Sequence, residues 1–76
     1  MYVKAGKHAV TVKLSKAFYS EDIVKRCVKD ARAMYKVEEA CDKHYYLITI
    51  KPHKKVNLQA LGYDFCNYVL GAMKVL

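Results

Sequence analysis

Residues 8–14 alternate between apolar and polar side chains, which predicts a half-buried β-strand. Val10, Val12 and Leu14 fall on one face of this strand, and polar residues fall on the other. The clean alternation favours a strand with one face on a core and one in water.

Residues 20–35 repeat apolar side chains at helical spacing and predict a first helix that ends near Tyr35. Ser20 is expected to cap the helix through its hydroxyl, and Glu21 and Asp22 follow in the first turn, where the helix dipole favours negative charge. The apolar face of this helix comprises Ile23, Val24, Cys27, Val28, Ala31, Met34 and Tyr35.

Two more strands are predicted over residues 37–41 and 45–51, joined by a turn at Asp42 and Lys43. The second is dense in aromatic and β-branched residues, so we expect it to be central. Pro52 ends it, because proline has no N–H for the ladder.

The last twenty residues, 56–76, predict a second helix with two apolar stripes, its N-terminus capped by Asn57. The main stripe comprises Leu58, Leu61, Phe65, Val69, Ala72, Met73 and Leu76. Phe65, together with Ile48 of the central strand, is expected at the centre of the core. Tyr63, Cys66 and Leu70 form the second stripe, which is either a partner surface or buried against the first helix.

The predicted order is β-α-β-β-α, which favours an α+β fold of two layers. We expect a three-stranded mixed sheet with both helices on one face, a ferredoxin-like split βαβ unit without its final strand. In that arrangement residues 10–14 form an edge strand, whose backbone would be open to pairing with a peptide or a second copy. Val10, Val12 and Leu14 are therefore partner-binding candidates, with Lys13 discouraging indiscriminate pairing.

The length of 76 residues allows one domain, residues 1–76, and the apolar fraction of 54% excludes a disordered chain. So small a domain is marginally stable alone, which favours a homodimer or a partner-bound state. No apolar run is long enough to span a membrane, and residues 1–8 have no apolar segment of a secretory signal. We therefore expect a cytoplasmic protein.

Fourteen basic residues stand against seven acidic ones, giving a net charge of +7. Twelve of the fourteen are lysines, which argues for solubility and attraction to acidic partners more than for sequence-specific nucleic-acid readout. Neither the Gly-X-X-Gly clamp of KH domains nor the aromatic pattern of RRM domains is present. Two basic patches nevertheless make nucleic-acid binding the second choice, with solvated surface as the alternative for each. They are the first-helix stripe of Lys25, Lys29, Arg32 and Lys36, and the loop patch of Lys51, Lys54 and Lys55.

The residues that carry chemistry predict neither an enzyme acting alone nor a bound metal or cofactor. Cys41 and His44 have the spacing of half a zinc site, but no second pair follows. Glu38 and Glu39 are adjacent and point to opposite faces of a strand, and there is no nucleophile turn or glycine-rich loop. The three cysteines, at positions 27, 41 and 66, are odd in number and widely spaced, so we expect free thiols.

Between residues 10 and 70 the chain resembles HxsD, the small protein of the His-Xaa-Ser peptide-maturation system. The resembling segments are Val10-Thr11-Val12-Lys13-Leu14, Tyr19-Ser20 with Ile23, Ile48-Thr49-Ile50-Lys51-Pro52, and Leu61-Gly62-Tyr63-Asp64-Phe65-Cys66-Asn67. Asp64, Phe65 and Asn67 match the acidic residue, Phe and Asn that recur in the last helix of that family. The lysine excess and the tyrosines at positions 63 and 68 depart from its pattern.

HxsD is encoded beside radical-SAM enzymes and a repeat peptide precursor. The resemblance therefore implies an accessory role in modifying a peptide, and it carries over no catalytic residue. Our expectation is a small non-catalytic accessory domain that binds a protein or peptide, with a basic nucleic-acid-binding domain as the alternative.

Overall fold

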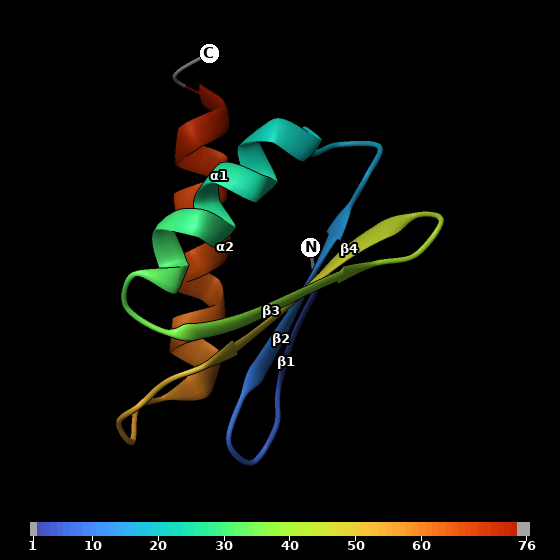
Figure 1. The fold of residues 1–76 in the computed structure, drawn as a ribbon. Coiled ribbons are helices and arrows are strands. Elements are labelled where there is room, and N and C mark those ends of the chain that lie inside the picture. The colour runs from blue at the N-terminus through green and yellow to red at the C-terminus, as the bar shows by residue number, and fades with distance from the viewer. Residues whose placement is uncertain (1, 75–76) are drawn as a thin grey trace.

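One layer of the molecule is a four-stranded antiparallel sheet, and two helices on one of its faces form the other layer (Figure 1). The computed structural model describes residues 2–74. The elements in chain order are β1 (Tyr2–Ala5), β2 (Val10–Ser15), α1 (Glu21–Arg32), β3 (Lys36–Cys41), β4 (Tyr45–Lys51) and α2 (Leu58–Lys74).

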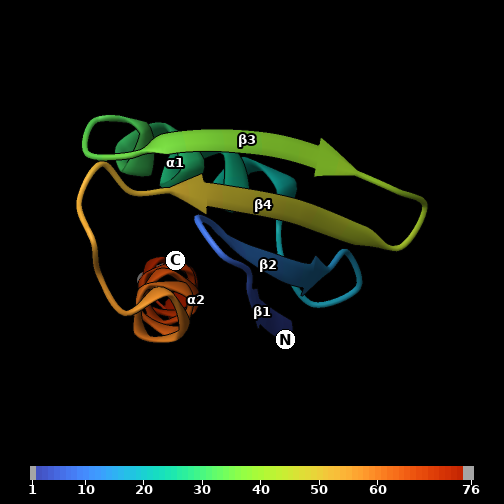
Figure 2. The ribbon, with the colours of Figure 1, turned by 90° about the horizontal axis from the view of Figure 1, so that it is seen from below.

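The strand order across the sheet is β1-β2-β4-β3, as Figure 2 shows with α2 seen end-on. Strand β4 lies between β2 and β3 and is antiparallel to both, so β2 and β3 run parallel to each other with α1 connecting them. The inner position expected for the most apolar strand is confirmed.

The expected three-stranded mixed sheet is wrong in two respects, because the sheet has a fourth strand and is antiparallel throughout. The additional strand, β1, pairs with β2 from Tyr2 opposite Lys13 to Ala5 opposite Val10. Of its four residues only Val3 is partly buried against the core, so its apolar pattern is too short to indicate a strand.

Strand β2 is consequently an inner strand, and the edge position expected for residues 10–14 is wrong. Its backbone pairs with β1 on one side and with β4 on the other. The side chains of Val10, Val12 and Leu14, expected to bind a partner, are fully buried beneath the helices. The sheet edges are β1 and β3 instead.

The core lies between the helices and the inward faces of the two inner strands. Ile48 is completely buried and Phe65 is 6% exposed, so both predicted core residues are in place. The largest fully buried side chains are Leu14, Ile48, Ile50, Val10, Val12, Val24, Val28, Val69, Cys27 and Cys66.

The helix ends follow the sequence signals only in part. Asn57 caps α2 as expected, since its Oδ1 accepts a hydrogen bond from the Ala60 N–H at 3.1 Å. Ser20 occupies the N-cap of α1, but its hydroxyl makes no capping hydrogen bond. Helix α1 ends at Arg32, one turn earlier than the apolar periodicity predicts, because Lys36 already belongs to β3.

Among residues 2–74, neither helix combines the length and the apolar character needed to cross a bilayer.

Candidate functional site

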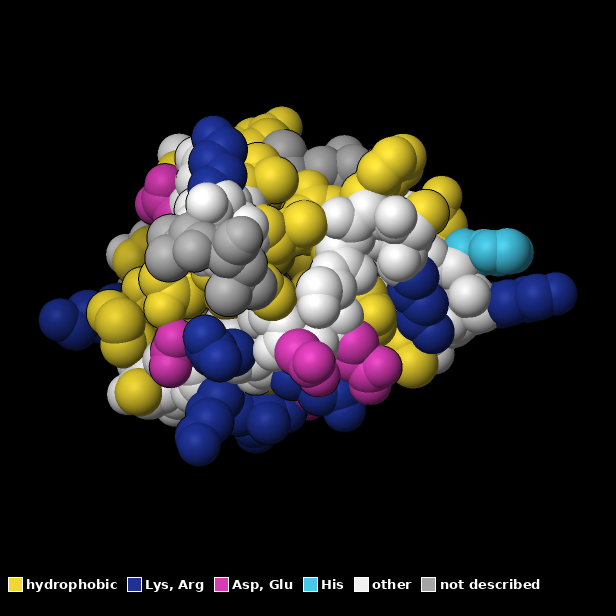
Figure 3. Space-filling view, turned by 90° about the horizontal axis from the view of Figure 1, so that it is seen from above, with side chains coloured by type: hydrophobic (Ala, Val, Ile, Leu, Met, Phe, Trp, Pro, Cys, Tyr) yellow, Lys and Arg dark blue, Asp and Glu magenta, His cyan; other side chains and the backbone are white. Residues whose placement is uncertain are grey.

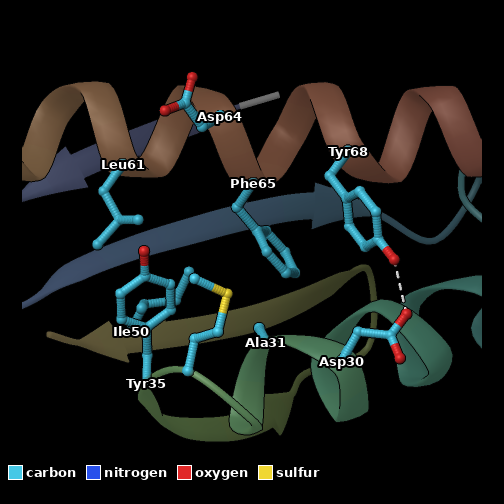
Figure 4. Close-up of a pocket in the computed structure, with 9 residues that line it drawn as sticks. Asp30, Ala31, Tyr35, Ile50, Leu61, Asp64, Phe65 and Tyr68 are labelled. Atoms are coloured by element: carbon cyan, nitrogen blue, oxygen red, sulfur yellow. Dashed lines mark hydrogen bonds between the residues drawn. The ribbon is translucent and has the colours of Figure 1, made fainter.

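A groove with a volume of about 340 Å³ lies between α1 and α2 (Figure 4). In Figure 4, Leu61, Phe65 and Tyr68 project from α2 toward α1, and Ala31 and Tyr35 lie opposite them. The complete lining comprises Asp30, Ala31, Met34, Tyr35, Ile50, Leu61, Asp64, Phe65 and Tyr68.

The groove has a buried apolar floor and an exposed apolar rim. Phe65 and Ile50 form the floor and are 6% and 1% exposed. Met34 and Tyr68, by contrast, are 67% and 50% exposed. Since large apolar side chains at an accessible concave surface favour binding of another apolar group, this geometry is typical of a docking site.

A hydrogen bond between the two helices spans the groove. The Tyr68 hydroxyl of α2 donates to the Oδ2 of Asp30, in the last turn of α1, at 2.6 Å (Figure 4). This bond stabilises the protonated phenol and thereby raises the pKa of Tyr68. The bond holds the Tyr68 ring across the groove and so defines its width there.

Two carboxylates lie near the groove, and that of Asp30 is directed across it toward Tyr68 (Figure 4). Asp30 is bonded to Tyr68, and Asp64 projects from the outer side of α2 at the rim. Both residues are exposed, in a chain whose net charge is +7. The arrangement therefore suits an apolar side chain that has a basic group beside it.

The second stripe expected on α2 does not form one continuous surface. Tyr63 is 47% exposed, but Cys66 is completely buried and Leu70 packs partly against the core. Burial raises the pKa of the Cys66 thiol to about 11, because desolvation penalises the thiolate. Of the three candidates, Tyr63 alone presents a large accessible side chain.

The basic stripe expected on the first helix is shorter than predicted. Lys25 pairs with Glu21 at 3.5 Å, and the Arg32 Nε donates to the Val37 carbonyl at 3.3 Å. Lys36 lies beyond the end of α1, in β3, opposite Lys51 of β4. Val37 is buried under the helices, so the side chain before it points to the other face of the sheet. The stripe is thus reduced to Lys25, Lys29 and Arg32.

The loop patch is divided between two environments. Lys51 Nζ lies 2.8 Å from Glu38 Oε1, and this contact lowers the pKa of the Glu38 carboxyl. Lys54 and Lys55 are exposed beside the turn between β1 and β2, around a hollow of about 420 Å³. Lys7 and His8 line the same hollow as this loop, although some 45 residues separate the two segments in the chain.

Cys41 and His44 flank the turn of the hairpin between β3 and β4. Both residues are exposed, and the Asp42 Oδ1 between them accepts hydrogen bonds from the N–H groups of His44 and Tyr45 at 2.8 and 2.7 Å. These bonds lower the pKa of Asp42. Over residues 2–74, the structure has no group of three or more His, Cys, Asp or Glu side chains that could hold a metal ion.

The groove itself was missed by reasoning from the sequence. Met34 and Tyr35 fall on the apolar face expected for the first helix, and Tyr68 stands out in the sequence only as a departure from the HxsD pattern. The available signal was an excess of apolar positions on two helices that share one sheet face. Figure 3, viewed from the end at which α2 finishes, shows hydrophobic side chains across the middle of the view and both acidic and basic side chains along its lower part.

Comparisons with protein-family models, with curated proteins and with solved structures give no significant match.

Proposed function

We propose that this chain is a small non-catalytic accessory domain that binds a peptide or a segment of a partner protein in the groove between α1 and α2. The observation that carries the proposal is the exposure of Met34 and Tyr68 above a floor of Phe65 and Ile50. Covering these side chains removes apolar surface from water, which is the main driving force of association.

The occupant we propose is an extended or helical segment with one large apolar side chain next to Lys or Arg. The apolar side chain would enter between Leu61 and Met34, and the basic group would lie against Asp30 at the rim. The Tyr68 hydroxyl is bonded to Asp30 Oδ2, which leaves the second carboxylate oxygen of Asp30 to accept a hydrogen bond from the basic group.

The resemblance to HxsD supports a peptide as the partner and radical-SAM peptide maturation as the setting. The genes next to the one for this chain test that setting directly, because it requires a radical-SAM enzyme and a peptide precursor among them. A homodimer is compatible with this role, since association stabilises a small domain by mass action.

A selection experiment tests the groove. A displayed library of random seven-residue peptides is selected against the protein, and the binders are then tested against Ala31→Phe, which places a ring in the groove. We expect the selected peptides to share a large apolar residue beside Lys or Arg and to lose at least tenfold in affinity for Ala31→Phe.

The matched control is Tyr63→Ala, which removes an exposed tyrosine of the same helix that does not line the groove. It should bind the selected peptides as the unmodified protein does. Peptides that bind Ala31→Phe normally, or that lose affinity for Tyr63→Ala instead, would place the binding surface elsewhere.

Nucleic-acid binding is the alternative function, and the first-helix stripe gives it little support. Helix α1 has four basic and three acidic residues, so its surface is close to neutral.

A further inference from the structure

We propose that the face of the sheet away from the helices, together with the basic loops at one end of it, binds single-stranded nucleic acid. We call this side of the sheet the open face. The basic end is the cluster of Lys7, His8, His53, Lys54 and Lys55 around the 420 Å³ hollow. The site is independent of the groove between the helices.

Half of the fourteen basic residues of the chain gather on these two adjoining surfaces. Alternation along the strands places Lys4, Lys13, Lys36 and Lys51 on the open face, because the residues next to them face the core. Three further lysines belong to the basic end. Against these seven lysines stands one acidic residue on the open face, Glu38. Phosphate groups are the ligands that such a concentration of lysines attracts.

The strand register arranges the open face in rows that cross the sheet. One row runs from Tyr2 through Lys13 to Leu47, and the next runs from Lys4 through Thr11 to Thr49. Neighbouring rows are about 7 Å apart, since a strand advances about 3.4 Å per residue. Lysines therefore recur in successive rows, as contact with a series of phosphates requires.

Two tyrosines interrupt the lysines on this surface. Tyr2 is 52% exposed and Tyr45 is 37% exposed, and Lys13 lies between their strands with its Nζ 4.5 Å from the centre of the Tyr45 ring. Exposed aromatic rings on a sheet offer stacking platforms for unpaired bases. Tyrosines next to lysines favour a single strand as the ligand, because the bases of a duplex are already stacked and paired inside it.

Two of the four lysines on the open face contact neighbouring side chains. Lys51 is fixed by its 2.8 Å contact with Glu38, and Lys13 by its contact with Tyr45. Thr11 and Thr49 bond each other through their hydroxyls at 3.2 Å in the middle of the face. These contacts restrict the side chains of Lys13 and Lys51, which limits the side-chain entropy that they lose on binding.

Fluorescence anisotropy with labelled dT12, rU12 and a 12-base-pair duplex, between 25 and 300 mM salt, tests the proposal. We expect the single strands to bind with micromolar affinity at low salt and more tightly than the duplex. Lys54→Gln combined with Lys55→Gln should reduce the slope of log K against log salt by about 1.4, because each phosphate contact contributes about 0.7. Tyr2→Ala should weaken single-strand binding by about tenfold.

Two control variants match these substitutions on the helical layer. Lys25→Gln combined with Lys29→Gln removes the same charge from α1, and Tyr63→Ala removes a similarly exposed tyrosine from α2. Both control variants should leave the affinity for single strands within about twofold. Because the α1 pair lowers the net charge as much as the loop pair does, it is the control for overall charge. Circular dichroism confirms that each variant is folded.

Several results would overturn the proposal. One is the absence of binding to either single strand at 25 mM salt. Another is a preference for the duplex combined with no effect of Tyr2→Ala, which would indicate charge attraction alone. Equal losses from the α1 pair and the loop pair would exclude this surface as the site. Binding to vesicles containing phosphatidylserine without binding to dT12 or rU12 would identify an acidic membrane as the partner instead.

Discussion

Gly62 of α2 lies so close to Val3 of β1 that a Cβ at position 62 would be 2.5 Å from the Val3 Cγ1. The same Cβ would be 2.8 Å from the Cγ2 of Val10 in β2. Such approaches are shorter than carbon atoms tolerate, so only glycine lets the helix reach the sheet here. The contact joins the last helix to the strand that the sequence did not predict.

Two glycine substitutions on α2 should therefore have opposite effects. Gly62→Ala is expected to lower the free energy of unfolding by about 1–3 kcal/mol, because the methyl group forces the helix away from β1 and β2. Gly71 has open space around its Cα, so Gly71→Ala should raise the free energy of unfolding by up to about 1 kcal/mol through helix propensity. Urea denaturation of both variants measures the difference. A stabilised Gly62→Ala would contradict the close contact.

Truncation of Phe65 should remove much of the stability of the domain. Phe65→Ala leaves a cavity between α2 and the sheet, and the expected loss is about 3–5 kcal/mol. That loss is comparable with the whole stability of a small domain. Thermal denaturation followed by circular dichroism measures it. An unchanged melting curve in a soluble Phe65→Ala variant would show that the side chain is not in the core.

The three cysteines should differ sharply in reactivity. Cys41 is exposed and should react within minutes with a thiol reagent at pH 8, whereas Cys27 and Cys66 are 1% and 0% exposed and should react only as the protein opens. Mass spectrometry during labelling counts the modified thiols. Rapid modification of two or three thiols in the folded protein would contradict the burial.

Burial of Cys66 also predicts that stability falls in alkaline solution. The folded-state pKa of about 11 lies above the ordinary value of 9.0, so the folded protein holds this proton more tightly than the unfolded chain does. The stability that this proton contributes is complete below pH 9 and is lost as the pH rises toward 11. Urea denaturation at pH 8 and at pH 10.5 measures the loss. Cys66→Ala should show a smaller loss, because the raised pKa values of Cys27, Tyr19 and Tyr68 act in the same direction and remain.

We expect a homodimer to form through α2, with Tyr63 at its interface. Replacing Tyr63 and Leu70 with Ser should abolish a dimer while the fold is retained, since Tyr63 is 47% exposed. Light scattering gives the mass, and circular dichroism reports the fold. Unfolding of the double variant would show that the partly buried Leu70 is a core residue. Tyr63→Ser alone is the control, because it leaves Leu70 in place. A chain that stays monomeric at millimolar concentration would exclude self-association.

The sequence by itself determined both helices and the strands β2, β3 and β4, because each has a periodic pattern long enough to identify its buried face. Val10, Val12 and Leu14 alternate over β2, and Phe65 and Val69 recur on α2. The central strand was also predictable, because residues 45–51 are dense in aromatic and β-branched side chains.

Strand β1 was decided by the tertiary structure. It has four residues, of which Val3 packs partly on the core, and its stability comes from pairing with β2 and from contact with Gly62. No local pattern contains those interactions. Its presence turns β2 into an inner strand, and this is why the expected edge was misplaced.

The candidate sites belong to the tertiary structure in the same way. Phe65 and Tyr68 are apolar positions on α2, and Met34 lies in the turn after α1. The sequence does not state whether these two segments cover each other. The approach of α2 to the sheet at Gly62 and the Tyr68–Asp30 bond between the helices leave a groove there. The basic end likewise arises because pairing of β1 with β2 places their turn beside the loop that precedes α2, bringing together charges that are remote in the chain.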